Sequence, residues 1–177
     1  MSSNITPSSL ATVPVFSGIP EPDLGVLVEL AEEVEIGAGE QLFSEDEPAD
    51  AFYVVLQGGV DVFSRGNGSE ERLLSHLGTG TAIGETSLLT DGLHSVTARA
   101  TEATRLLRFS DKRFQALLEA GSLPAYRLVA NLARVLAARL RTAGDHLIDV
   151  EANQSAPIAQ EDDLDRLRKI FFTDWRL

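Results

Sequence analysis

The residues that best suit ligand binding, by their types and by their spacing, lie in one stretch, Ala82–Ala100, with the sequence AIGETSLLTDGLHSVTARA. A short apolar strand leads into Gly84, where the absence of a Cβ lets a ligand approach the backbone. The next residues, Glu85-Thr86-Ser87-Leu88-Leu89, are expected to form about one and a half helical turns. Amide groups at the start of a helix lack intrahelical acceptors and attract anions. The stretch therefore predicts a phosphate pocket that needs no metal.

Two motifs of the chain resemble the cyclic nucleotide-binding domain family. The segments IGETSLL and HSVTA are similar to the family's phosphate-binding cassette, F-G-E-L-A-L-L-x(3)-P-R-A-A-T. Upstream, Gly39–Val62 resembles its opening hairpins, G-E-x-I…G-D-x-F-Y-x-I-x-x-G-x-V-x-V. The resemblance covers roughly residues 16–150 and implies a CAP/FNR-like effector domain without the helix-turn-helix.

The resemblance also implies a set of ligand-binding residues. The family uses its cassette glutamate to accept the ribose 2′-hydroxyl, and Glu85 holds that place. The cassette glycine and two small hydroxyls are likewise retained. The residues predicted to bind a ligand are Gly84, Glu85, Thr86, Ser87, His94, Ser95 and Thr97.

The cassette departs from the family at its charged position. The arginine that grips the cyclic phosphate falls on His94, and the proline before it falls on Leu93. Histidine has a reference pKa of about 6.5, so a fixed charge is lost. One charge-assisted hydrogen bond contributes about 1.5–3 kcal/mol, or roughly tenfold to a hundredfold in affinity. We hypothesise that His94 binds phosphate when protonated, so that affinity rises as the pH falls.

The adenine contact of some cyclic AMP-binding relatives is also missing. Their Thr-Ser pair falls on Ala143-Gly144, whose side chains cannot hydrogen-bond a base. The ligand is therefore left as cyclic AMP, cyclic GMP or a related small anion.

Composition limits the remaining classes of function. The net charge of -12 argues against a DNA partner, because nucleic-acid surfaces need clustered lysine and arginine. There is no cysteine, and no apolar run approaches the ~20 residues of a membrane span. The first residues lack a signal-peptide pattern, which favours the cytoplasm. The three histidines have no metal-ligand spacing, so we expect no metal, no cofactor and no catalytic site.

The stretch between residues 34 and 110 is predicted to form short strands separated by turn residues. Eight strands at this spacing indicate an antiparallel β-roll or jelly roll, a mainly β fold with flanking helices. The expected strands are Val34–Ile36, Gln41–Phe43, Phe52–Gln57, Gly59–Arg65, Glu71–Leu77, Thr81–Ile83, Ser95–Ala100 and Thr104–Ser110.

The rest of the chain is expected to flank this roll. Residues 1–13 have loop composition and are predicted to be a flexible arm. Apolar spacing from Leu24 to Ala31 predicts a short helix at the start of the domain, which spans residues 14–150. A linker is expected over 151–160, followed by an amphipathic helix over 161–177 that would dock on the chain itself or on a protein partner.

Two helices are expected after the last strand. Asp111 is predicted to cap the first and Gly121 to end it, while Pro124 opens a longer helix that Gly144 weakens. A heptad seam on the long helix favours a homodimer, with a second stripe left for the roll; the alternative is that both stripes pack within the same chain. The seam residues are Val129, Ala133, Leu136, Leu140, Ala143, Leu147 and Val150, and the second stripe is Leu128, Leu132 and Val135.

These patterns favour a non-enzymatic regulatory domain that senses a cyclic nucleotide through a weakened phosphate grip. The alternative is the same fold with a degenerate pocket, acting as a dimerisation or protein-docking scaffold. An enzyme on a cupin-like roll is disfavoured, because that chemistry needs clustered metal ligands.

Overall fold

The fold is seen in a computed structural model that describes residues 5–65, 70–85 and 92–153. In the last part of the long helix, residues 139, 140 and 142–153 are described by their backbone only. The elements in chain order are α1 (Pro7–Leu10), η1 (Pro14–Phe16), α2 (Glu21–Leu30), β1 (Ala31–Ile36), β2 (Gln41–Phe43), β3 (Ala51–Gln57), β4 (Gly59–Ser64), β5 (Arg72–Gly78), β6 (Ala82–Ile83), β7 (Thr97–Ala100), β8 (Thr104–Ser110), α3 (Asp111–Glu119) and α4 (Leu123–Asn153).

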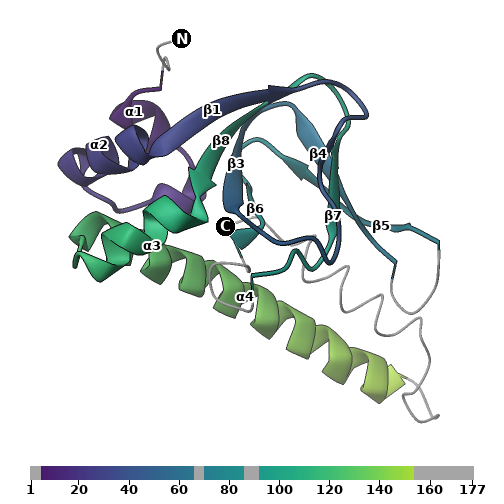
Figure 1. The fold of residues 1–177 in the computed structure, drawn as a ribbon. Helices are drawn as coiled ribbons and strands as arrows, with labels where there is room; N and C mark the ends of the chain where they lie inside the picture. Colours follow the sequence, from purple (N-terminus) through teal and green to yellow (C-terminus); the bar gives the residue numbers. More distant parts are fainter. Residues whose placement is uncertain (1–4, 66–69, 86–91, 154–177) are drawn as a thin grey trace.

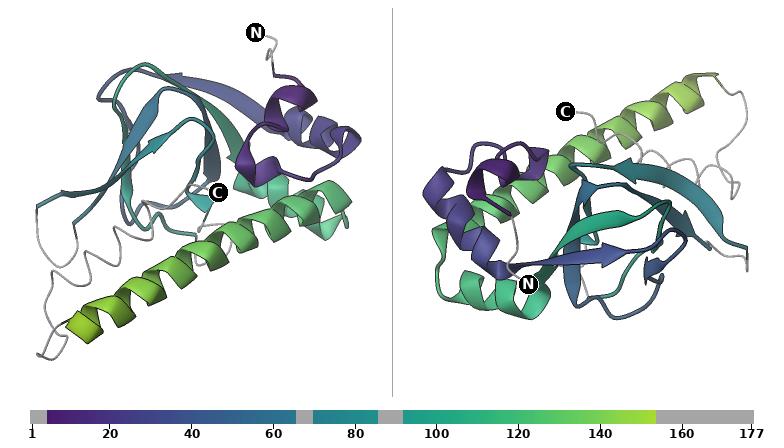
Figure 2. Two further views of the ribbon diagram at one scale, coloured as in Figure 1. Left: turned by 180° about the vertical axis from the view of Figure 1, so that it is seen from behind. Right: turned by 90° about the horizontal axis from the view of Figure 1, so that it is seen from above.

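The eight strands form two antiparallel sheets, ordered β1-β8-β3-β6 and β2-β7-β4-β5. The helices gather at one end of this roll, and α4 runs along its lower side (Figures 1 and 2). The predicted mainly β fold, with eight strands and flanking helices, is confirmed. Among the described residues, no helix is long and apolar enough to cross a membrane.

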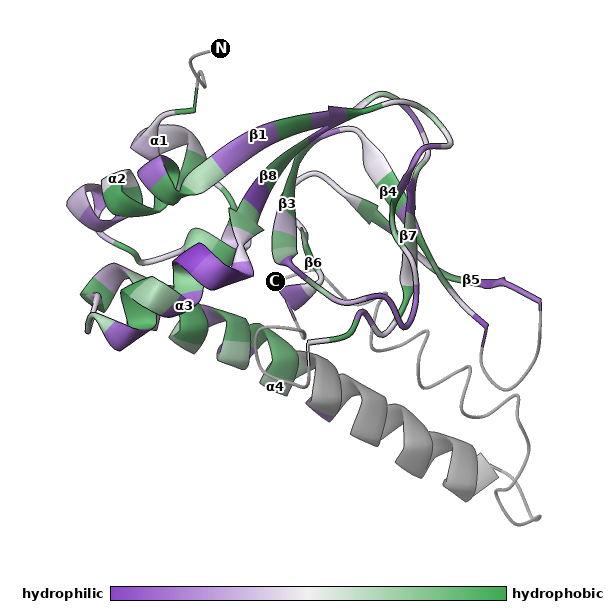
Figure 3. Cartoon of the chain, viewed as in Figure 1, coloured by the Kyte–Doolittle hydropathy of each residue, from purple (hydrophilic) through white to green (hydrophobic). Residues whose placement is uncertain are grey.

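Two apolar cores hold the layers together, and β3 contributes to both. Alternate side chains of a strand point to opposite faces. Tyr53 and Val55 therefore lie in the core between the sheets, whereas Phe52 and Val54 lie in the core under the helices. The near-continuous apolar colour of β3 in Figure 3 reflects this burial on both faces.

The first half of α4 packs on the domain through the predicted second stripe. Leu128 and Leu132 are fully buried in the core under the helices, and Val135 is 8% exposed. The side-chain amide of Asn131 donates to the carbonyl oxygens of Val15 and Ser17 at 2.9 Å each. These contacts join α4 to the N-terminal layer. In the predicted heptad seam, Leu136 is half-buried, Ala133 is exposed, and Val129 is partly buried against the core under the helices. The other seam residues lie in the part of α4 that is described by its backbone only.

Within the predicted flexible arm, residues 7–10 form helix α1, which loop composition did not predict. Thr6 and Ser9 form a capping box for α1, with the Ser9 amide donating to Thr6 Oγ1 at 3.3 Å. Leu10 is fully buried and Val13 is 6% exposed. The threonine, serine and proline that suggested a loop are also the residues that start a helix.

Three smaller expectations at helix ends also need correction. Asp111 is the first residue of α3 and Ser110 is its N-cap, which makes no side-chain capping bond. Helix α4 continues through Gly144 to Asn153 and so enters the predicted linker. Ala31 begins β1 and does not end α2. The predicted C-terminal helix, residues 161–177, lies outside the described residues.

Candidate functional site

The cassette begins where β6 meets Gly84. Gly84 has a φ of 78°, a conformation that glycine adopts without steric cost. A Cβ at this position would lie 3.4 Å from the carbonyl oxygen of Ala51 and 3.4 Å from Cε1 of His94. The positive φ therefore explains the glycine, since these distances are ordinary van der Waals contacts that a Cβ would tolerate. Glu85 follows and is 3% exposed.

His94 is buried beside Gly84 and stacks on an aromatic ring. Its imidazole lies 3.7 Å from the ring of Phe43, centroid to centroid, with the planes 7° apart. Its backbone is fixed as well, because its amide donates to the Glu47 carbonyl oxygen at 2.9 Å and its carbonyl oxygen accepts from the Asp46 amide at 2.8 Å. The side chain at the position of the family arginine is thus buried between Phe43 and Gly84.

Burial also decides the charge of His94. Desolvation lowers the pKa of the imidazole below its ordinary value of 6.5, although the carboxylates of Asp50 and Glu47 act in the opposite direction. The hypothesis of a protonated His94 therefore requires a pH below 6.5. Near pH 7 the ring is neutral and can offer a phosphate a hydrogen bond but no charge.

The native protein is expected to lose stability as the pH falls from about 7 to 5.5. The folded-state pKa of His94 is depressed, so the unfolded chain takes up the proton first and the stabilisation is lost as the pH falls through the folded-state pKa. Urea unfolding at pH 7.5, 6.5 and 5.5 measures the loss. His94→Phe, which keeps a ring on Phe43, should flatten this dependence. Equal pH dependence in the wild type and His94→Phe would contradict the prediction.

The other predicted site residues divide into three groups. Thr86 and Ser87 lie outside the described residues. Ser95 is exposed next to His94. Thr97 is 1% exposed, and its hydroxyl accepts a hydrogen bond from the Glu45 amide at 3.0 Å. The structure thus brings Gly84 and His94 into contact and ties Thr97 to the segment after β2.

Ser75 on β5 is a polar residue of the barrel interior that the sequence reasoning missed. It pairs with Val62, which belongs to the core between the sheets, and it is 6% exposed. Its hydroxyl has no hydrogen-bond partner among the described residues. A buried hydroxyl without a partner is costly unless a ligand or water satisfies it. The one sequence signal was a serine between the apolar residues Leu74 and Leu77.

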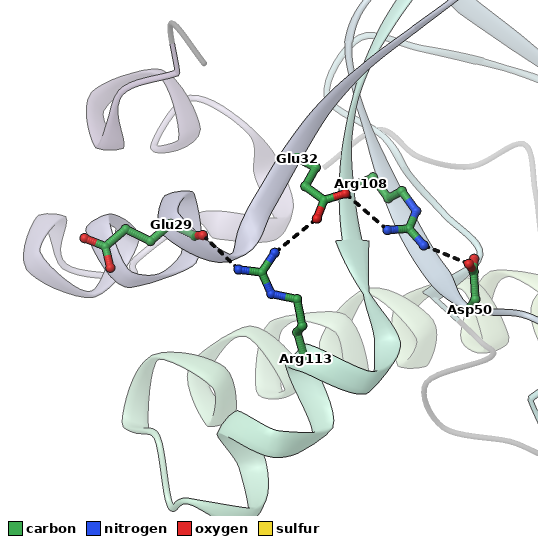
Figure 4. A network of polar contacts seen from close by, with 5 residues as sticks. All are labelled: Glu29, Glu32, Asp50, Arg108 and Arg113. Carbon is green, nitrogen blue, oxygen red and sulfur yellow. Dashed lines mark hydrogen bonds and ion pairs between the residues drawn. The ribbon is translucent and has the colours of Figure 1, made fainter. Parts of the chain in front are cut away.

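A network of charged side chains lies where β1, β3 and β8 meet the helices (Figure 4). Arg108 on β8 contacts Asp50 at 2.8 Å and Glu32 at 3.3 Å. Arg113 on α3 contacts Glu32 at 3.1 Å and donates to the carbonyl oxygen of Glu29 at 3.5 Å. The network joins the start of β3 to both flanking helices.

Metal chemistry finds no support in the described part of the chain. No three histidine, aspartate or glutamate side chains there group in a way that would hold a metal ion. The arrangement instead combines amide groups, hydroxyls and one neutral imidazole, which suits a small polar ligand.

Comparison with known proteins adds independent information. The family described as cyclic nucleotide-binding domain matches residues 33–120. The cyclic AMP receptor protein of Thermus thermophilus is 34% identical over 130 residues, which cover 73% of this chain and 58% of that protein. The CRP-like cAMP-activated global transcriptional regulator of Mycobacterium tuberculosis is 29% identical and is covered to 61%. This chain therefore spans about three fifths of the length of these relatives.

Solved structures agree with the sequence relatives. The Thermus thermophilus catabolite activator protein superposes with a TM-score of 0.68 at 33% identity, covering 78% of this chain and 63% of that one. A putative cyclic nucleotide-binding protein from Geobacter metallireducens gives a TM-score of 0.66 at 26% identity, covering 77% of this chain and 98% of that one. The similarity thus extends from the sequence to the arrangement of the strands.

Proposed function

Because this chain belongs to the cyclic nucleotide-binding domain family, we propose that it is a non-enzymatic sensor that binds a cyclic nucleotide, cyclic AMP or cyclic GMP, in the pocket around Gly84. The observation that carries the proposal is the pairing of Gly84 at positive φ with the buried Glu85 at the start of the cassette. The chain retains both of these cassette residues, together with the small hydroxyls of Ser95 and Thr97.

Each residue has a role in this proposal. Glu85 accepts the ribose 2′-hydroxyl, and backbone amides from Gly84 onward hold the phosphate with Thr86 and Ser87. His94 and Ser95 add neutral hydrogen bonds, while Thr97 supports the pocket through Glu45. Ser75, whose buried hydroxyl has no partner among the described residues, adds a contact from the barrel interior.

The output of the sensor is proposed to pass through α4. The half-buried Leu136 and the exposed Ala133 lie on its heptad seam, which would pair with the same helix of a second copy. Ligand binding would then shift the population of α4 positions, limited by the difference in affinity between the two states. Sedimentation equilibrium of the full chain reports the dimer directly.

The degenerate scaffold remains a second candidate, and one observation favours it. The imidazole at the family's arginine position is buried and neutral near pH 7, in a chain of net charge -12. A pocket of this kind attracts phosphate less than one with a fixed cation. The two candidates differ in whether the wild-type chain binds any cyclic nucleotide.

Glu85→Gln is expected to weaken cyclic AMP binding by about tenfold, because a hydrogen bond to a charged group contributes about 1.5 kcal/mol or more. Calorimetric titration with cyclic AMP and cyclic GMP measures the change. Glu71→Gln is the matched control, since Glu71 pairs with Arg99 at 3.1 Å and its side chain is 36% exposed.

Micromolar binding by the wild type that Glu85→Gln weakens and Glu71→Gln leaves unchanged would support the sensor. No heat from the wild type at millimolar nucleotide would refute it and leave the scaffold.

A further inference from the structure

Arg108 presents a cation at the end of the barrel where the cassette begins. It lies opposite Tyr53 in the β3–β8 ladder, and Tyr53 lies opposite Ile83 in the β3–β6 ladder. Ile83 directly precedes Gly84. Arg108 also shares its strand face with Leu106, which is part of the core between the sheets. Three adjacent strands thus place the guanidinium and the cassette at the same end of one sheet.

Asp50 connects this cation to the position of the missing arginine. Its Oδ2 atom lies 2.8 Å from Nη2 of Arg108. The same carboxylate acts electrostatically on His94, whose pKa it raises against the larger effect of burial. The backbone supports this link, because the Ala49 amide donates to the Gly92 carbonyl oxygen at 2.7 Å and the His94 amide to that of Glu47 at 2.9 Å, so Asp50 directly follows the segment that pairs with residues 92–94.

Arg108 is held more firmly than its acidic partners. Its side chain is 23% exposed and its residue lies opposite Tyr53 in the β3–β8 ladder, whereas the side chains of Asp50 and Glu32 are 74% and 52% exposed. Burial alone would lower the pKa of Arg108, but Asp50 and Tyr53 together raise it, so the guanidinium stays charged. Exposed ion pairs contribute only about 0–1 kcal/mol, so an incoming anion can replace such a carboxylate.

We propose that Arg108 supplies the charge that the cassette has lost, by binding the ligand's phosphate in place of the Asp50 carboxylate. The proposal rests on the proposed function. Guanidinium binds phosphate through two parallel hydrogen bonds, and the planar fork of Arg108 already makes one contact on each side (Figure 4). Asp50 then competes with the ligand for Arg108.

Calorimetric titration of the full chain with cyclic AMP at pH 7.5 tests this assignment with three variants. Arg108→Gln should weaken binding about tenfold, the effect of losing one charge-assisted bond. Asp50→Asn should tighten binding several-fold, because it removes the competitor and a negative charge. Arg113→Gln, which removes the other arginine on Glu32, should stay within about twofold of the wild type.

The opposite signs separate the proposal from a purely structural role. Arg108→Gln and Asp50→Asn break the same ion pair, so a structural role predicts weaker binding in both. Thermal melts of each variant show whether it is folded. If Arg108→Gln does not fold, the sign of the Asp50→Asn effect still decides: tighter binding supports the assignment and weaker or equal binding overturns it.

The outcomes also distinguish this inference from the function on which it rests. Wild-type binding that Arg108→Gln leaves unchanged would overturn the role of Arg108 alone. No wild-type binding of cyclic AMP or cyclic GMP at millimolar concentration would refute the proposed function, and the role of Arg108 with it.

Discussion

Phe109→Ala is expected to lower the free energy of unfolding by about 3–5 kcal/mol, the range for truncating a buried phenylalanine. Phe109 is fully buried on β8, stacked on Phe52 with centroids 4.7 Å apart and planes 7° apart. Its centroid also lies 5.9 Å from that of Phe16 in the N-terminal layer. The substitution leaves a cavity where the sheet meets the helices, and urea unfolding at pH 7.5 measures the loss.

Leu73→Ala is the matched control on the outside of the barrel. Leu73 is 51% exposed on β5, so its truncation should change the free energy of unfolding by no more than about 0.5 kcal/mol. A loss below about 1 kcal/mol for Phe109→Ala, within the usual range for single substitutions, would show that the helical layer does not depend on this aromatic cluster.

His94→Arg is expected to tighten cyclic AMP binding by about tenfold to a hundredfold, since it restores a charge-assisted bond of about 1.5–3 kcal/mol. The negative charges of Asp50 and Glu47 act electrostatically on residue 94 and would partly neutralise the positive charge of an arginine there, which would reduce the gain in affinity. The present imidazole lies beside Gly84, so the arginine side chain would begin next to the first residue of the cassette. Calorimetric titration at pH 7.5 measures the gain.

His94→Gln separates charge from the loss of the imidazole. It brings a polar side chain without a charge and should therefore give no gain in affinity. If His94→Arg is folded in a thermal melt and binds cyclic AMP no better than the wild type, the loss of the fixed charge does not limit this pocket.

The result for His94→Arg also bears on the choice between a sensor and a scaffold. Binding that first appears in His94→Arg would mean that the pocket is otherwise intact and that the wild type is the degenerate form. Measurable wild-type binding would leave open how a pocket with a neutral imidazole holds an anion. Arg108 answers that question through its position beside Asp50.

Local sequence patterns predicted much of the fold. The expected strands overlap all eight observed strands, because each is a short apolar run between turn residues. Pro124 lies in the first turn of α4, and Gly121, with a φ of 74°, follows α3. The errors lie at α1 and at the first residue of α3, where serine, threonine and aspartate suit both a loop and a helix start.

The site was predicted less completely than the fold. Gly84, Glu85 and His94 were found because they stand within one continuous motif. Ser75, Tyr53 and Arg108 were not, because they lie on three other strands, β5, β3 and β8. Asp50 and Arg108 are 58 positions apart in the chain, and only the pairing of β3 with β8 brings them together.

The sequence by itself determined the positions of the strands along the chain, the place of the cassette and the loss of the family's arginine, since these depend on neighbouring residues. Only the tertiary structure decided that His94 is buried on Phe43 and neutral near pH 7, because desolvation depends on what surrounds the ring. It also decided that an arginine from β8 stands beside Asp50. Register between distant strands places that charge, and no local pattern encodes it.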